Sequence, residues 1–203
     1  MTEEDVLAVI SRDDRRMAIL KAVAALGLDD WWIGAGFVRN AVWDDLYHTE
    51  STPLNDVDVA YFKPLGSYGM PEDAQIGRIV ADEPNAVWDE ETRFARELGT
   101  QMPDLEFEVK NQARMHLSKA RLAPREPYAS AADAIADWVE TATCIGVRLD
   151  DAGNLALLAC YGLSDLASGI IRPTKPAYAE RARERAQAKG WLSRWPQLKF
   201  ERA

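Results

Sequence analysis

Two aspartates stand two positions apart in a segment of alternating residue types. Asp56 and Asp58 share one set of positions, and Val57, Val59 and Tyr61 share the other. In an extended strand, side chains at i and i+2 project from the same face, so the two carboxylates lie side by side. Neighbouring carboxylates repel each other unless a cation lies between them, and Mg²⁺ prefers a few carboxylates completed by water and substrate phosphates. The pair therefore predicts a magnesium site suited to a phosphorylated ligand.

A second acidic pair repeats this spacing. Glu106 and Glu108 lie in the alternating segment 105–109. If this strand pairs beside residues 56–62, one glutamate supplies a third carboxylate, and three carboxylates can hold two Mg²⁺ ions for in-line displacement at phosphorus. Periodicity places both glutamates on one face and leaves open which of them serves. The alternative is that each acidic pair is only the solvated face of a strand, the more common role of such spacing taken alone.

A glycine turn precedes these acids. Gly34-Ala35-Gly36 separates a short apolar segment, residues 31–33, from residues 37–47, which have helical spacing. Such a turn lets the backbone approach a phosphate, and the N-terminus of the following helix offers N–H groups and a favourable dipole. The turn lacks the third glycine of a dinucleotide fingerprint and does not match a P-loop. The Asp-x-Asp pair strengthens the interpretation of this turn as a phosphate-binding element, because a magnesium-bound nucleotide needs both a phosphate-binding loop and a metal site.

Basic and aromatic residues supply further candidates. Arg39, in the first turns of the helix, is placed to reach a phosphate, although an ion pair with Asp44 or Asp45 suits it equally. Arg172 and Lys175 follow a predicted strand and are the favoured additional phosphate contacts. Most tryptophans stand at core-like positions, where packing is the better interpretation. The residues that we interpret as a solvated helix face are Arg181, Arg183, Arg185 and Lys189, and the tryptophans left open as ligand contacts are Trp191 and Trp195.

Charge and composition limit the class of protein. The 203 residues carry a net charge of −9, which argues against a general nucleic-acid surface. The segment from Arg172 onward is basic and the rest is acidic, so the tail is suited to face either a phosphate-rich ligand or the acidic body itself. No apolar run has the length of a membrane span, and the acidic N-terminus is unlike a secretory signal, so we expect a cytoplasmic protein without a membrane partner. Two cysteines, Cys144 and Cys160, form no disulfide framework or zinc site, and we expect them to be reduced and packed opposite each other across a hairpin.

The elements that must position these residues form an α+β pattern. We expect a single nucleotide-binding domain over residues 1–203, with N-terminal helices over 1–27, a motif-bearing core over 28–120, and a C-terminal hairpin and basic helical segment over 121–203. Short strands alternate with helices, so the expected fold is a small mixed sheet flanked by helices rather than a large doubly wound sheet. Strands are expected over 31–33, 56–62, 105–109, 143–149 and 155–161, and helices over 3–26, 37–47, 71–98, 131–139 and 176–189, with breaks near Gly27 and Pro84.

Residues 33–62 resemble the glycine turn and Asp-x-Asp strand of the DNA polymerase β-like nucleotidyltransferases. They are especially similar to the Gly-Gly-x-Val-Arg-Asp pattern of CCA-adding enzymes and bacterial poly(A) polymerases. Residues 107–116, 161–166 and 171–173 also resemble a bacterial family of nucleotidyltransferase-like proteins, and this likeness covers most of residues 30–200. The departures are Ala35 in place of a glycine and Asn40 in place of an aspartate, which removes a partner for Arg39.

The resemblance implies a role for each matching position. Asp56, Asp58 and Glu108 would be the catalytic carboxylates and the ligands of two Mg²⁺ ions. Glu108 is preferred to Glu106 because it precedes Val109, as in the Glu-Val strand of the CCA-adding enzymes. The nucleotide-binding residues would be Gly34, Ala35, Gly36 and Arg39.

The activity implied is transfer of a nucleoside monophosphate from a nucleoside triphosphate such as ATP to an acceptor hydroxyl, with release of pyrophosphate. A small molecule or a protein hydroxyl suits the acidic body better than a long RNA, and the basic tail keeps tRNA open. The alternatives are a catalytically silent nucleotide-binding or antitoxin-like module with the same fold, and a structural protein whose carboxylates face solvent.

Overall fold

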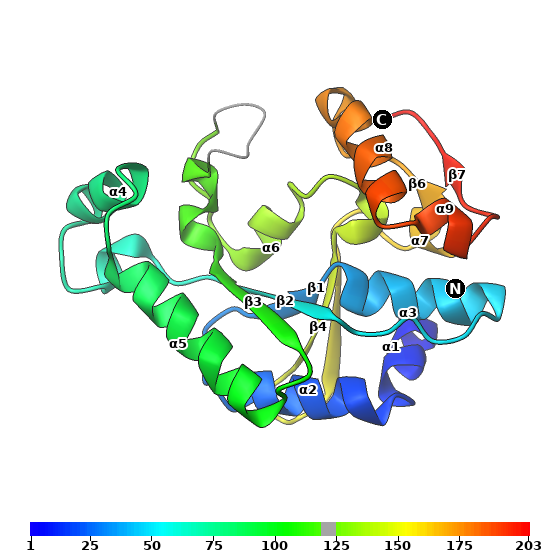
Figure 1. Cartoon of the computed structure of the whole chain (residues 1–203), viewed down its shortest axis with the longest axis horizontal. Helices are drawn as coiled ribbons and strands as arrows, with labels where there is room; N and C mark the ends of the chain where they lie inside the picture. The colour runs from blue at the N-terminus through cyan, green and yellow to red at the C-terminus, as the bar shows by residue number, and fades with distance from the viewer. Residues whose placement is uncertain (119–124) are drawn as a thin grey trace.

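The computed structural model describes residues 1–118 and 125–203 (Figure 1). Five of its strands form one mixed sheet in the order β3-β2-β1-β4-β5. These strands are β1 (Trp32–Gly34), β2 (Asp56–Tyr61), β3 (Glu106–Asn111), β4 (Ile145–Leu149) and β5 (Leu155–Ala159). The predicted fold, a small mixed sheet flanked by helices, is confirmed. The predicted boundary between residues 120 and 121 lies outside the described residues.

The pairing of β2 with β3 brings the two acidic pairs together. The strands are parallel, and their register sets Asp56 opposite Glu106 and Asp58 opposite Glu108. Parallel neighbours need a long crossover connection, which here contains η1 (Leu65–Ser67), α4 (Glu72–Val80) and α5 (Ala86–Gln101). The two strands therefore pair as the sequence required for a shared carboxylate site.

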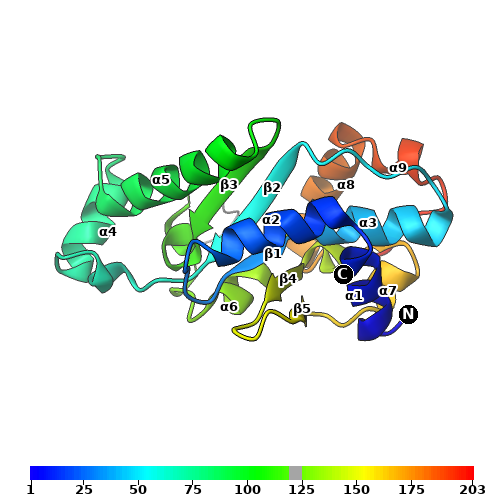
Figure 2. The ribbon, with the colours of Figure 1, turned by 90° about the horizontal axis from the view of Figure 1, so that it is seen from below.

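Helices cover one face of the sheet and create the main core. Figure 2 shows α2 (Asp14–Ala24), α3 (Gly36–Tyr47) and α5 lying across this face. Val57 and Val59 of β2 and Val109 of β3 are buried in the same core cluster as residues of these helices. Because side chains alternate along a strand, the acidic residues of β2 and β3 project from the opposite face.

The opposite face is bordered by later parts of the chain. These are η2 (Gln112–Leu117), α6 (Ala131–Ile135), α8 (Ala179–Ala188) and α9 (Trp191–Arg194). In Figure 1, α6 and α8 lie on the other side of the sheet from α2 and α5. A small apolar cluster that includes Trp32, Ala60 and Ile135 fixes α6 to the sheet. The acidic face is thus bordered by later elements, with Asp58 partly buried and Asp56, Glu106 and Glu108 still exposed.

Side-chain caps mark the starts of several helices. Thr2 and Asp5 form a capping box at the start of α1 (Glu3–Ser11), and Asp13 caps α2. Asn85 caps α5 directly after the break predicted at Pro84. At the hairpin between β4 and β5, the Cys160 N–H donates to the Cys144 carbonyl (3.1 Å), and both thiols are free, as expected.

Several segments differ from the prediction. The helix expected over 131–139 ends at Ile135, and the chain then turns toward η3 (Thr141–Thr143). The helix expected from residue 176 begins as a single 3₁₀ turn, η4 (Pro176–Tyr178), before α8. A two-stranded parallel sheet and a short helix were not predicted, because such short elements show no periodicity: β6 (Ile170–Ile171), β7 (Lys199–Phe200) and α7 (Ser164–Ala167). Within the described ranges, no helix combines the length and apolarity needed to cross a membrane.

Candidate active site

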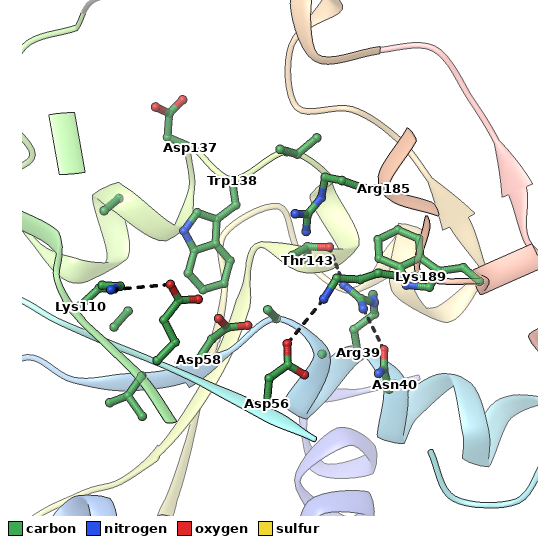
Figure 3. A pocket seen from close by; sticks show the side chains of 18 of the residues that line it. Arg39, Asn40, Asp56, Asp58, Lys110, Asp137, Trp138, Thr143, Arg185 and Lys189 are labelled. Carbon is green, nitrogen blue, oxygen red and sulfur yellow. Dashed lines mark hydrogen bonds and ion pairs between the residues drawn. The ribbon is translucent and has the colours of Figure 1, made fainter. Parts of the chain in front are cut away.

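A cleft of about 610 Å³ opens on the acidic face of the sheet. Its floor is β2 and β3, one end is the N-terminus of α3, and the wall opposite comes from α8 and α9 (Figure 3). The lining includes Ala35, Gly36, Arg39, Asn40, Asp56, Asp58, Glu108, Lys110, Asp137, Trp138, Thr143, Arg181, Arg185, Lys189, Trp191, Arg194 and Trp195. The cleft therefore joins the predicted metal ligands, most of the glycine turn and a basic wall.

The three predicted carboxylates all line this cleft, whereas Glu106 is not among its lining residues. Two of them have cationic partners: Lys189 Nζ lies 3.6 Å from Asp56 Oδ2, and Lys110 Nζ lies 3.7 Å from Glu108 Oε1. Among residues 1–118 and 125–203, no three His, Cys, Asp or Glu side chains are arranged to hold a metal ion. The strand register thus brings the predicted ligands to one cleft, but their side chains are not arranged around a single metal position.

The pKa of Asp58 is shifted by this arrangement of carboxylates. Burial raises the pKa of Asp58 to about 6, and repulsion from Glu108 and Asp56 adds to the rise. Negative charge is therefore costly here without a further cation. Because carboxylate oxygens are the donors that Mg²⁺ prefers, the residues present fit a magnesium site.

The glycine turn has a backbone geometry that suits phosphate binding. Ala35 takes φ 53° and ψ −124°, and its N–H donates to the Ile145 carbonyl of β4 (3.2 Å). Helix α3 then starts at Gly36, with no side chain capping its N-terminus and no acidic residue in its first turn. The first N–H groups of α3 are thus left for an anion at the end of the cleft.

Gly34 has a different role from its neighbours. It is not among the lining residues of the cleft. A Cβ atom at this position would lie 2.6 Å from Cη2 of Trp138 and 3.0 Å from the Ile145 carbonyl oxygen. The absence of a side chain therefore lets the Trp138 indole pack over the turn, and Trp138, expected only to fill a core, borders the cleft instead.

Arg39 lies beneath the basic wall of the cleft and is only 2% exposed. Its Nη1 donates to Thr143 Oγ1 (2.9 Å) and its Nη2 donates to Asn40 Oδ1 (2.8 Å). Its Nε is buried and makes no hydrogen bond. Burial lowers the pKa of Arg39 to about 10, although the carboxylate of Glu140 opposes this change.

The alternative ion pair of Arg39 with Asp44 or Asp45 is not formed. Asp44 accepts hydrogen bonds from Trp195 and Arg194, and Asp45 pairs with Arg12. Asn40 does not remove the partner of Arg39 either, because its side-chain oxygen still accepts from the guanidinium. The partner at this position is therefore a neutral amide rather than a carboxylate.

A buried glutamate that the sequence did not reveal connects Arg39 to α8. Glu140 is 1% exposed and accepts hydrogen bonds from Thr143 Oγ1 and Arg185 Nε, both at 2.9 Å. Arg39, Thr143, Glu140 and Arg185 thus form one continuous polar chain from α3 to α8. No local pattern marks Glu140, since it stands in an isolated β-bridge with Pro173 and its charged partner, Arg185, is remote in sequence.

The C-terminal basic residues are distributed differently from the prediction. Arg181, Arg185 and Lys189 line the cleft, so the interpretation of this helix as a solvated face is wrong for them. Their spacing of four residues, which places them on one helix face, was the available signal. Arg183 lies on another face and pairs with Glu180 (3.7 Å).

The favoured phosphate contacts have other partners. Arg172 bonds to Asp165 and Glu201, and Lys175 bonds to Asp137. Neither basic residue is among the lining residues of the cleft. Trp191 and Trp195 do border the cleft, although they are only 2% and 1% exposed. They act mainly as packing residues for the basic wall.

The fold and cleft define a nucleotidyltransferase, and comparison with known proteins agrees. Residues 21–200 match the sequence profile of the family described as nucleotidyltransferase, and the chain belongs to that family. No curated protein matches the sequence. A solved structure described as revealing a CCA-adding enzyme head domain is 26% identical to this chain, with a TM-score of 0.77, over 100% of this chain and 97% of that one.

Longer enzymes share the fold alone. A CCA-adding enzyme in complex with CTP is 12% identical, with a TM-score of 0.54, and the match covers 98% of this chain and 43% of that one. A tRNA-processing enzyme complex is 19% identical, with a TM-score of 0.50, over 90% of this chain and 43% of that one. The chain thus spans less than half the length of these two enzymes.

Proposed function

We propose that this nucleotidyltransferase uses Mg²⁺ to transfer a nucleoside monophosphate from a nucleoside triphosphate to an acceptor hydroxyl, releasing pyrophosphate. The observation that carries this proposal is the β2–β3 register, which sets Asp58 beside Glu108 in a cleft that ends at the N-terminus of α3. One edge of this cleft is suited to metal ions and the other to phosphates.

Asp56, Asp58 and Glu108 would hold two Mg²⁺ ions. Bound there, the ions would supply a lowered pKa for the acceptor hydroxyl and charge neutralisation for the leaving pyrophosphate. Asp58, the most enclosed of the three, would fix the position of the α-phosphate, and Glu108 would orient the acceptor oxygen. Their separation over two paired strands lets the two partners approach from different sides.

The glycine turn would bind the triphosphate. The Gly36 N–H and the other N–H groups of the first turn of α3, with the dipole of this helix, favour negative charge at this end, and the Ala35 backbone shapes the turn. The Gly36 N–H would share charge that develops at the transferred phosphate. Arg39 adds positive charge from beneath, and Gly34 maintains the turn below Trp138. The Trp138 indole, which borders the cleft, is suited to contact a nucleobase.

The net charge of the protein is the basis for the proposed class of acceptor. The net charge of −9 disfavours a long RNA and favours a small molecule or a protein hydroxyl. The CTP in the CCA-adding complex is the ligand of that enzyme and does not identify the nucleotide used by this chain. The nucleotide preference is therefore tested with all four triphosphates.

The test measures binding and product separately. Purified protein with Mg²⁺ is titrated with each triphosphate, and pyrophosphate release is followed with no added acceptor, with tRNA, or with a pool of small hydroxyl compounds. Mass spectrometry of the protein itself detects self-modification. The double variant Asp56→Asn/Asp58→Asn should lose metal-dependent nucleotide affinity, whereas Asp151→Asn, at the exposed hairpin turn, should keep it.

Each outcome has a distinct meaning. Nucleotide binding with pyrophosphate release supports the proposal. Binding without any product identifies a catalytically silent nucleotide-binding module. Unchanged nucleotide affinity in the double variant contradicts the metal assignment.

A further inference from the structure

Helix α8 presents a row of cations to the cleft. Arg181, Arg185 and Lys189 recur every four residues, so they follow one another along a single helix face, and all three line the cleft. Figure 3 shows Arg185 and Lys189 on the side of the cleft across from Asp56 and Asp58. Successive turns of a helix are about 5.4 Å apart, so the three side chains can contact different parts of an extended polyphosphate.

The helix is fixed in this orientation by its other contacts. Ala182 and Ala186, on an adjacent face, are buried at 0% and 1% exposure. Arg185 Nε donates to the buried Glu140, which uses one of its five N–H donors. The row therefore faces the cleft because α8 is packed and tethered.

Lys189, at the C-terminal end of α8, contacts the predicted metal site directly. Its Nζ lies 3.6 Å from Asp56 Oδ2, and both side chains are about half exposed, at 48% and 60%. The ammonium group offers a single positive charge to a group of carboxylates that carries more negative charge than it can neutralise. Lys189 and a divalent cation would therefore compete for Asp56.

We propose that the row Arg181–Arg185–Lys189 binds the polyphosphate of the nucleotide together with the glycine turn, and that Lys189 exchanges Asp56 for a phosphate when the metal-bound nucleotide enters. This inference rests on the proposed function and names the residues that recognise its substrate. In the free protein the Lys189–Asp56 pair disfavours metal binding without nucleotide. When the substrate enters, Lys189 pairs with the phosphates and Asp56 binds the metal. Binding of the metal and binding of the nucleotide therefore favour each other.

Inorganic tripolyphosphate tests the row without metal or chemistry. Metal-free protein in EDTA and low salt is titrated calorimetrically, comparing wild type with Arg181→Gln, Lys189→Gln and the matched control Arg183→Gln. Because a charge-assisted hydrogen bond to phosphate is lost, the first two variants should bind about threefold to tenfold more weakly. Arg183→Gln should change affinity by less than about twofold, since an exposed charge outside the site acts only through screened attraction. No binding by wild type, or equal losses in all three variants, would overturn the proposal.

Manganese binding tests the exchange. With no nucleotide present, free Mn²⁺ is measured by electron paramagnetic resonance. Lys189→Gln should bind Mn²⁺ about threefold more tightly than wild type, because the competing ammonium is gone. Equal Mn²⁺ affinity in the two proteins would refute the exchange. Thermal denaturation of each variant checks that these substitutions leave the fold unchanged.

The two proposals fail in different ways. If no nucleotide product is ever formed but the variants lose tripolyphosphate affinity as described, the transfer reaction fails and the phosphate site stands. If wild type transfers nucleotide while Arg181→Gln and Lys189→Gln bind tripolyphosphate as wild type does, only the phosphate site fails.

Discussion

The guanidinium carbon of Arg39 lies 4.1 Å from the ring centroid of Trp191. This contact joins a residue of the glycine-turn helix to the first residue of α9, far away in the sequence. The Trp191 ring also meets Trp43 of α3 edge to face, with centroids 5.8 Å apart. The basic wall of the cleft is thus held on α3 by aromatic packing around one buried cation.

Truncating this aromatic contact should loosen the wall. We expect Trp191→Ala to lower the free energy of unfolding by about 3–5 kcal/mol, because it removes a buried indole and leaves a cavity. Leu192→Ala, at a neighbouring side chain that is 43% exposed, should cost less than about 0.5 kcal/mol. Urea denaturation of both variants measures the difference. Similar losses in the two would show that Trp191 has no special role.

The buried carboxylate of Glu140 should be a second support of the wall. Glu140→Gln removes the charge that faces Arg185 and is the carboxylate with the largest effect on Arg39, so two cations lose their main compensating charge. We expect a loss of about 3 kcal/mol in unfolding free energy, the size typical of breaking a buried ion pair. Glu180→Gln, whose side chain is 79% exposed, is the control and should be nearly neutral. A neutral Glu140→Gln would mean that solvent screens this group.

The pairing of Asp165 with Arg172 should make stability depend on pH. Burial alone would raise the pKa of Asp165, but hydrogen bonds from Arg172 and Thr141 hold this pKa below its usual value. Since the unfolded pKa is about 3.9, the contribution of the ionised group is complete above that pH and is lost as the pH falls through the lower folded pKa. Asp165→Asn should therefore be destabilising at pH 7 and progressively less so toward pH 3. An equal penalty at both pH values in urea denaturation would contradict this.

The sequence predicted the strands and the acidic face, because these depend on local alternation. Asp56 and Asp58 share a face in any regular strand. That Glu108 lies beside Asp58 was only conditional, since strand pairing depends on the whole crossover between β2 and β3. The sheet and the identity of the acidic candidates were thus readable, and their spatial convergence was not.

The sequence could not assign Arg181, Arg185 and Lys189 to the cleft, because the same pattern occurs in two environments. Cations separated by alanines occur both on solvated helices and on helices that line a site. The buried Ala182 and Ala186 decide the orientation of α8, and only tertiary packing reveals that they are buried. Gly34 is a similar case, since Trp138, the residue that requires it to lack a side chain, lies more than a hundred positions later.

The backbone of Ala35 should be strained. Its φ of 53° and ψ of −124° lie in a backbone region that glycine adopts readily and that a residue with a Cβ atom adopts only at an energetic cost. We expect Ala35→Gly to raise the unfolding free energy by about 1 kcal/mol, the relief of strain exceeding the added chain entropy. Ala8→Gly, at an exposed position inside α1, should instead lower it by about 0.5–1 kcal/mol. Two changes of the same sign, measured by thermal unfolding, would argue against strain at Ala35.

The close packing of Trp138 on Gly34 makes a final prediction. Gly34→Ala should destabilise the protein by about 1–3 kcal/mol, because the new Cβ would lie 2.6 Å from the indole and 3.0 Å from a backbone oxygen that cannot move away. Gly77→Ala, on α4 with no atom within 4 Å of the new Cβ, should stabilise by about 1 kcal/mol and controls for intrinsic propensity. Combining Gly34→Ala with Trp138→Leu should restore part of the loss relative to the sum of the single variants, since one of the two close contacts is removed. Strict additivity in this double-mutant cycle would mean that the indole does not press on the turn, and that Gly34 is required by the β4 backbone alone.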